Sequence, residues 1–129
     1  MDNFKVMVVD DEQDFLETII KRLKARKIEV AGAESGQRAL DLLASQDFDV
    51  MILDVKMPGM DGIETLREVK KRKPLTEVIM LTGHASVESG IQGMQLGAFD
   101  YVMKPVALDE LLEKMRQAYE RKLIQEGKG

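Results

Sequence analysis

The protein has 129 residues, 44% hydrophobic and 33% charged, a composition typical of one globular domain. It has no cysteine and one histidine, which excludes disulfides, cysteine nucleophiles and thiolate or multi-histidine metal sites. The net charge of −4 argues against direct binding of nucleic acid, and no apolar run approaches the roughly 20 residues that span a bilayer. We therefore expect a cytoplasmic protein without a membrane partner.

Short apolar runs alternate along the chain with amphipathic stretches of helical spacing. The runs predict strands at residues 4–9, 28–33, 50–53, 78–81 and 101–103. A helix is expected after each strand. Ser35, Asp61 and Ser86 can cap the second, third and fourth of these helices. In the fourth helix, Val87, Ile91 and Met94 are expected to face the core. The last helix should begin near residue 108.

Five β-α units in succession predict an α/β fold with one parallel sheet covered by helices on both faces. Right-handed crossovers favour a doubly wound topology. The second strand ends in Ala33-Glu34 without a candidate site residue, and we expect it at or near an edge of the sheet. Residues 1–124 are predicted to form the single domain, and residues 125–129 a polar tail.

Polar residues follow the other four strands directly. They are Asp10, Asp11 and Glu12 after the first strand, Asp54 after the third, Thr82 after the fourth, and Lys104-Pro105 after the fifth. Ligands of open parallel sheets bind at the carboxyl ends of the strands, so these side chains should gather at one edge. Taken singly, each residue fits a helix cap or a turn. Capping does not explain why a threonine and a lysine join the acids.

The chemistry of this group favours a metal-assisted phosphoryl site. Clustered carboxylates repel one another unless a cation lies among them, and Mg²⁺ prefers oxygen ligands. Asp10 or Asp11, together with Asp54 and one loop carbonyl, would leave room on the ion for water and a phosphate oxygen. An aspartate can also accept a phosphoryl group covalently. Thr82 and Lys104 could then contact the phosphoryl oxygens.

The sequence resembles the receiver domain of two-component response regulators. The matching segments are VVDDE (8–12), LDVKMPGMDG (53–62), LTGH (81–84), GAFDYVMKP (97–105) and LDELL (108–112). They span nearly the whole chain in order. The segment from residue 81 to 105 is most similar to receivers of enhancer-binding transcription activators. The resemblance implies a flavodoxin-like fold with strand order 2-1-3-4-5.

The resemblance also implies a role for each residue of the group. Asp54 would be the phosphoacceptor. Asp10, Asp11, Asp54 and the backbone carbonyl of Lys56 would hold Mg²⁺ or Mn²⁺. Lys104 would contact the phosphoryl group, and its peptide bond to Pro105 would be cis. Thr82 would swing towards the phosphoryl group, and Tyr101 would turn inward with it.

The implied partners are a sensor histidine kinase and a downstream output domain or effector protein. The output surface would be the last two helices and the strand between them, residues 86–123, and a phosphorylation-dependent homodimer is compatible with it. Similar receivers often have Phe-Asp where this chain has Val106-Ala107. Ala107 cannot cap the last helix through its side chain, so we expect that helix to begin more loosely.

Three alternatives remain at this stage. A haloacid-dehalogenase-like phosphatase also uses a strand-end aspartate, but Lys56 stands where its second carboxylate would be. A flavodoxin-like flavin binder needs a loop that cradles phosphate after the first strand, where this chain has three acids. A receiver-like module that binds partners without phosphorylation would not need the full set of acids, threonine and lysine.

Methionine and the single histidine are two further features of the sequence. We expect most of Met57, Met60, Met80, Met94, Met103 and Met115 to fill the core. Met60, in the loop beside the predicted site, is the one with a possible role at the surface. His84 is expected to be a surface residue that tunes the access of water to the acyl phosphate.

Overall fold

The computed structural model describes residues 4–83 and 87–127. Within these ranges the chain forms five strands and five helices in strict alternation. The strands are β1 (Lys5–Val9), β2 (Glu29–Ala33), β3 (Val50–Asp54), β4 (Glu77–Thr82) and β5 (Asp100–Met103). The helices are α1 (Gln13–Ala25), α2 (Gly36–Ser45), α3 (Gly62–Arg72), α4 (Val87–Gln95) and α5 (Leu108–Gln125).

All strands run parallel in one sheet with the order β2-β1-β3-β4-β5. This confirms the predicted α/β fold and the strand order, and it places β2 at an edge. The three interior strands, β1, β3 and β4, are almost entirely buried, as expected for strands covered on both faces. The carboxyl ends of all strands therefore meet at the same edge of the sheet.

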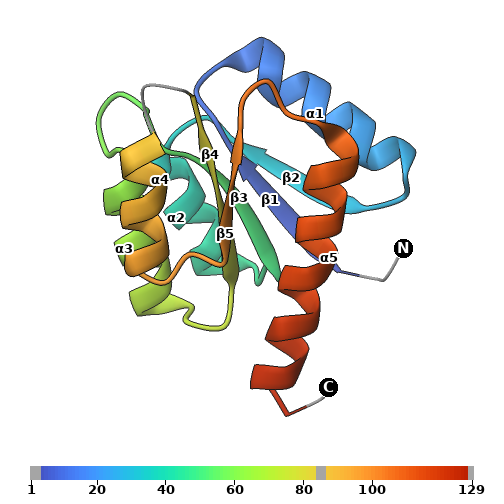
Figure 1. Ribbon diagram of the computed structural model, residues 1–129, viewed down its shortest axis with the longest axis vertical. Helices are drawn as coiled ribbons and strands as arrows, with labels where there is room; N and C mark the ends of the chain where they lie inside the picture. Colours follow the sequence, from blue (N-terminus) through green and yellow to red (C-terminus); the bar gives the residue numbers. More distant parts are fainter. Residues whose placement is uncertain (1–3, 84–86, 128–129) are drawn as a thin grey trace.

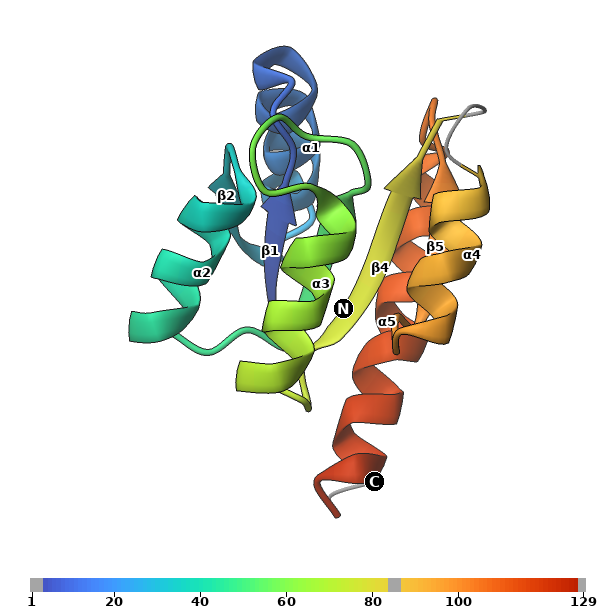
Figure 2. The ribbon, with the colours of Figure 1, turned by 90° about the vertical axis from the view of Figure 1, so that its left-hand side faces the viewer.

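Helices cover both faces of the sheet and enclose two apolar cores (Figures 1 and 2). The core on one face takes Leu40 and Leu43 from α2 and Leu66 and Val69 from α3. The core on the opposite face is built from buried side chains of α1 and α5: Leu16, Ile19, Leu23, Leu111, Met115 and Ala118. None of the helices in the described ranges is long and apolar enough to cross a membrane.

Side-chain caps fix the start of two helices. The Ser35 hydroxyl accepts a hydrogen bond from the Arg38 amide at 3.1 Å, and the Asp61 carboxylate accepts one from the Glu64 amide at 2.9 Å. Both predicted caps are confirmed. At α5, Ala107 makes no side-chain cap, as its identity required. Ser86 lies outside the described residues.

The predicted inward face of α4 is wrong at Ile91 and Met94, while the side chain of Val87, its third predicted member, lies outside the described part of the structure. Ile91 and Met94 are 48% and 40% exposed, whereas Gly90 is buried. A Cβ atom on Gly90 or Gly93 would come within 3.0 Å of side chains of β4, so the two glycines form the face that meets the sheet. The spacing of apolar residues predicted the wrong orientation for this helix, because its inward face is made of glycine, which has no apolar side chain to detect. The helix therefore turns two large apolar residues outwards.

The end of α5 differs slightly from the prediction. The helix continues through Gln125, one residue beyond the expected end of the domain at 124. The side chain of Lys122 supports this last turn, because its ammonium binds both Asp49, at 2.9 Å, and Glu126, at 2.7 Å. The domain limits themselves stay a prediction.

Candidate functional site

The carboxyl edge of the sheet brings the predicted site residues together. Asp10 follows β1, and its amide donates to the Ala33 carbonyl at 3.0 Å, which ties it to the end of β2. Asp54 is the last residue of β3 and pairs in register with Leu81, so Thr82 lies one residue further along β4. Parallel pairing alone thus places these residues at the same edge of the sheet.

Three carboxylates form the centre of the site. Asp10, Asp11 and Asp54 each offer an oxygen, and these ligand atoms all lie within 4.8 Å of one another. Asp10 is fully buried and Asp54 is 7% exposed, while Asp11 is exposed to solvent. Oxygen ligands at this spacing, with one open side, suit a hard divalent cation that keeps several waters. The residues present therefore fit Mg²⁺ or Mn²⁺.

Lys104 provides the positive charge of the site. Its ammonium lies 2.8 Å from Asp10 Oδ2, 2.8 Å from Glu12 Oε1 and 3.8 Å from Asp54 Oδ1. It also lies 4.6 Å from the centre of the Phe15 ring, a cation–π distance. The Lys104 amide donates to the Thr82 carbonyl at 2.7 Å, and the peptide bond from Lys104 to Pro105 is cis.

Burial and mutual repulsion shift the ionisation of the acids. Burial first, and then the neighbouring Asp10 carboxylate, raise the pKa of Asp54 to about 7, against the opposing effect of Lys104. Burial also raises the pKa of Asp10, although hydrogen bonds from Lys104 and from the Glu12 amide work in the opposite direction. The hydrogen bond from Lys104 lowers the pKa of Glu12.

The pKa of Lys104 is raised overall. Burial acts to lower it, but the hydrogen bonds to Asp10 and Glu12 outweigh that effect. Four acids and one lysine therefore share this edge, and the negative charge is only partly neutralised. A divalent cation among Asp10, Asp11 and Asp54 would relieve the remaining repulsion.

Thr82 is the last residue of β4, and Tyr101 lies on the neighbouring strand β5. Thr82 is fully buried, and its hydroxyl finds no hydrogen-bond partner within the described residues. Tyr101 is half-buried, and its carbonyl accepts a hydrogen bond from the Lys114 ammonium at 3.0 Å. The same ammonium pairs with Asp100 at 2.9 Å, which joins α5 to β5.

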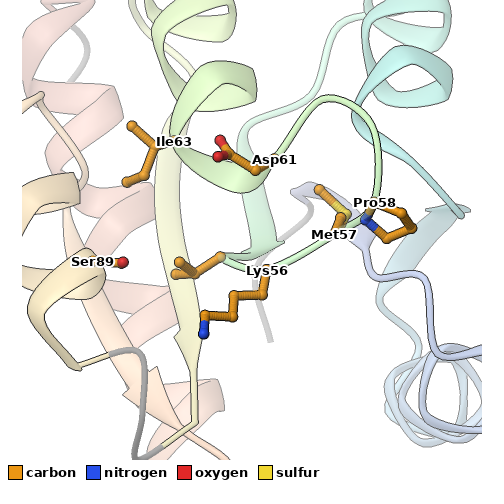
Figure 3. Close-up of a pocket in the computed structure, with 7 residues that line it drawn as sticks. Lys56, Met57, Pro58, Asp61, Ile63 and Ser89 are labelled. Atoms are coloured by element: carbon orange, nitrogen blue, oxygen red, sulfur yellow. The ribbon is translucent and has the colours of Figure 1, made fainter.

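A cavity of about 470 Å³ opens between α4 and the β3–α3 loop, which begins at Val55, the residue after Asp54. Figure 3 shows Ser89 and Ile63 on one side of it and Met57 and Pro58 on the other. The exposed side chain of Lys56 also lines it. The cavity gives solvent and small solutes a route to the loop beside the acids.

Most of the methionines fill the core, as expected. Met57, Met80 and Met115 are buried, Met60 and Met103 are half-buried, and Met94 is the exposed exception. Met60 packs at the edge of one core rather than projecting from the loop. His84 lies outside the described residues, so its expected role stays a prediction.

The sequence model of the response regulator receiver domain family matches residues 6–116. The chain belongs to this family. A solved receiver-domain protein from Clostridium thermocellum is 37% identical to it, with a TM-score of 0.90, and the match covers 95% of this chain and 98% of that one. This receiver therefore has the fold of its family along nearly its entire length.

Curated relatives are longer than this receiver. Transcriptional regulatory protein ZraR of Escherichia coli is 37% identical over 117 residues, which are 91% of this chain but 26% of that protein. Response regulator MprA of Mycolicibacterium vanbaalenii is 37% identical over 125 residues, 97% of this chain and 54% of that protein. The chain thus spans between a quarter and about half of these relatives, which are regulators by name.

Sequence reasoning missed two contacts of Lys104. Glu12 was grouped with the polar residues after the first strand, but without an ion pair to Lys104, and Phe15 was given no role at the site. In the structure the ammonium lies 2.8 Å from Glu12 Oε1 and 4.6 Å from the centre of the Phe15 ring. The spacing of Glu12 and Phe15 along α1 could have suggested a shared face, but nothing in the sequence pointed that face at residue 104.

Proposed function

We propose that this receiver takes a phosphoryl group from a histidine kinase onto Asp54 and uses it to switch a surface for an output partner. An Asp54 oxygen attacks the phosphorus atom of the donor phosphohistidine. The new P–O bond makes Asp54 an acyl phosphate. The P–N bond of the donor breaks, and its electron pair returns to the imidazole. The observation that carries the proposal is the buried Asp54 carboxylate, among two further acids and one lysine, at the end of a central strand.

Asp10, Asp11 and Asp54 would hold Mg²⁺ or Mn²⁺, with the backbone carbonyl of Lys56 as a further ligand. Such an ion neutralises charge on the phosphoryl oxygens and orients them for in-line transfer. The chain's own contribution is to hold the three carboxylates rigidly at the edge of the sheet. The buried Asp10 is fixed further by the Glu12 amide, which donates to its Oδ1 at 2.8 Å.

Lys104 would bind a phosphoryl oxygen after it leaves its present partners. Its ammonium is 1.0 Å closer to Asp10 and Glu12 than to Asp54, since the distances are 2.8, 2.8 and 3.8 Å. A phosphorylated Asp54 carries a charge of about −1.5 to −2 and three strong acceptors, so it would attract the ammonium more strongly. The hydroxyl of Thr82 would bind another of the oxygens.

The output surface of this proposal is formed by α4, β5 and α5. Exposed Ile91 and Met94 give it an apolar centre on α4, and the Asp100–Lys114 ion pair lies on its β5–α5 side. Movement of Thr82 and Tyr101 would change the shape of this surface. An output domain, an effector or a second copy of the chain would then bind the changed surface. A phosphoryl group biases such a two-state surface only through its different contacts in the two states.

Incubation with acetyl phosphate and Mg²⁺ tests the proposal. We expect intact mass spectrometry to show one added phosphoryl group on the wild-type protein and none on Asp54→Asn. Excess chelator should abolish the adduct while circular dichroism shows the protein still folded. The control is Asp41→Asn, an exposed aspartate on α2, which should be labelled like the wild type.

Two results would refute the assignment. The first is the absence of any adduct on the folded wild-type protein, which would favour a receiver that binds partners without phosphorylation. The second is an adduct that survives in Asp54→Asn, which would place the modification elsewhere.

A further inference from the structure

Helix α4 meets the sheet through glycines rather than through side chains. A Cβ atom at Gly90 would lie 2.8 Å from Cγ2 of Thr82 and 3.5 Å from Cγ of Tyr101. A Cβ atom at Gly93, one turn later, would lie 3.0 Å from Cγ of Met80. The views in Figures 1 and 2 agree that α4 lies alongside β4 and β5. The two glycines thus bring the helix close to the sheet but contact different residues.

Thr82 is the residue under Gly90, and its present position is unfavourable for its hydroxyl. The side chain is fully buried, yet Oγ1 has no hydrogen-bond partner in the part of the chain that the structure describes. A buried hydroxyl without a partner favours any rearrangement that supplies an acceptor. The proposed phosphoryl group would supply such acceptors on the neighbouring strand, at Asp54, which pairs with the residue preceding Thr82.

The methyl and hydroxyl groups of Thr82 move together. Both are attached to Cβ, so rotation about χ1 that turns the hydroxyl towards Asp54 takes Cγ2 away from its present contact. At present that methyl group fills the space that a side chain at position 90 would need. The position of Thr82 and the room beneath α4 are therefore linked through one contact.

We propose that Gly90 is the residue through which α4 senses the position of Thr82. Without a side chain at position 90, Thr82 can remain in its resting position against the helix. When Thr82 turns towards a phosphoryl group on Asp54, the contact opens and α4 can shift on the sheet. The inference rests on the proposed function, because it assumes that Thr82 binds a phosphoryl oxygen. Gly90 acts as a positioning residue and does not touch the reacting atoms.

The Gly90→Ala variant tests this link. Its Cβ would displace the Thr82 methyl group and so favour the position near Asp54. We expect beryllofluoride, a mimic of the phosphoryl group, to bind about two- to tenfold more tightly in the presence of Mg²⁺, the range that a modest rotamer penalty supplies. Isothermal titration calorimetry measures the affinity. In the unliganded variant, the NMR shift of the Thr82 methyl group should move towards its value in the beryllofluoride complex.

Gly93→Ala is the matched control. It makes the same substitution in the same helix, with the same gain in helix propensity, but its Cβ meets the flexible side chain of Met80. Its affinity for beryllofluoride should equal that of the wild type. A second control places Gly90→Ala in a Thr82→Ser background, where Cγ2 is missing and the hydroxyl remains. There the alanine should have no effect on affinity.

Each outcome decides between the proposals. A folded wild-type protein that binds no beryllofluoride refutes the proposed function itself. If the wild type binds, then a Gly90→Ala affinity that is unchanged or weaker overturns the role of Gly90 alone, as does an equal gain in Gly93→Ala. If Gly90→Ala does not fold, recovery of folding by Thr82→Ser supports the contact, and failure of the double variant to fold overturns it.

Discussion

The ionised Asp54 carboxylate lowers the free energy of unfolding, and the rest of the fold must compensate for this loss. Burial and the Asp10 carboxylate raise its pKa to about 7, whereas the unfolded chain gives it the ordinary value of an aspartate, about 3.9. Between these two values the folded state binds a proton that the unfolded state does not. The free energy of unfolding therefore falls as pH rises from about 4 to about 7, and the full penalty is present above pH 7.

Asp54→Asn should remove this penalty. We expect the variant to be more stable than the wild type at pH 8 in chelator, by about 1–3 kcal/mol. The difference should shrink as pH falls through 7 and vanish well below pH 4, where the wild-type carboxyl is protonated in both states. Urea unfolding at a series of pH values measures it, with Asp41→Asn as the control. A difference that stays constant with pH would show that ionisation is not its cause.

Lys104 illustrates how a single residue can hold a site in its resting state. Its two shorter ion pairs lie on the α1 side, with Asp10 and Glu12, and the longer distance is to Asp54. The Phe15 ring supports the ammonium from the same side. Binding to a phosphoryl group thus means exchanging these contacts for new ones. The exposed pair with Glu12 opposes that exchange only weakly, because solvent screens it.

At the scale of elements, the helix starts differ in how well they are fixed. Ser35 and Asp61 cap α2 and α3, whereas Ala107 leaves the first amides of α5 without a side-chain acceptor. The residue lies in extended conformation, with φ −82° and ψ 113°, which is the geometry of an N-cap. A serine at this position would therefore need no change of the backbone.

Ala107→Ser should stabilise the protein by about 1 kcal/mol, because its hydroxyl can accept from an amide of the first turn. Serine avoids a further negative charge beside Asp109 and Glu110, which already occupy that turn. The midpoint of urea unfolding reports the change. The control is Ala44→Ser, an exposed alanine near the end of α2, where the same substitution should cost a few tenths of a kcal/mol. Equal effects of the two substitutions would contradict the capping explanation.

The helices and strands differ in how well the sequence predicts them. Strands β1, β3 and β4 are apolar runs ending in polar residues, and both their positions and the shared edge were predictable. The orientation of α4 was not, because its inward face is made of Gly90 and Gly93 and its apolar residues point outwards. Side-chain pairing across the sheet, such as Lys104 with Glu12 over 92 positions, depends on distances that no local pattern contains.

At the scale of the whole molecule, the two ends of the sheet differ in charge balance. At the amino end, the buried Glu77 lies between Lys70, at 3.4 Å, and Arg121, at 3.1 Å, and Lys122 pairs with Asp49. Those acids are matched by cations from α3 and α5. At the carboxyl end, four acids share Lys104. A cation from solution should therefore stabilise the molecule chiefly through that end.

Mg²⁺ should raise the free energy of unfolding of the whole domain, because the carboxylates are brought together only in the folded state. A ligand at a hundredfold excess over its Kd adds about 2.7 kcal/mol. Thermal unfolding with and without Mg²⁺, at constant ionic strength, measures the gain. Asp11→Asn should lose most of it, since Asp11 is one of the three proposed ligands and the exposed one, so its replacement perturbs the core least.

The control for this experiment is Asp14→Asn, an exposed acid in the first turn of α1 that lies outside the three-carboxylate group. It changes the net charge by the same amount and should respond to Mg²⁺ like the wild type. In chelator, Asp11→Asn should be at least as stable as the wild type, because one repelling charge has gone. An undiminished response to Mg²⁺ in Asp11→Asn would place the bound ion away from these carboxylates, and the proposed phosphoryl chemistry would then lack its metal.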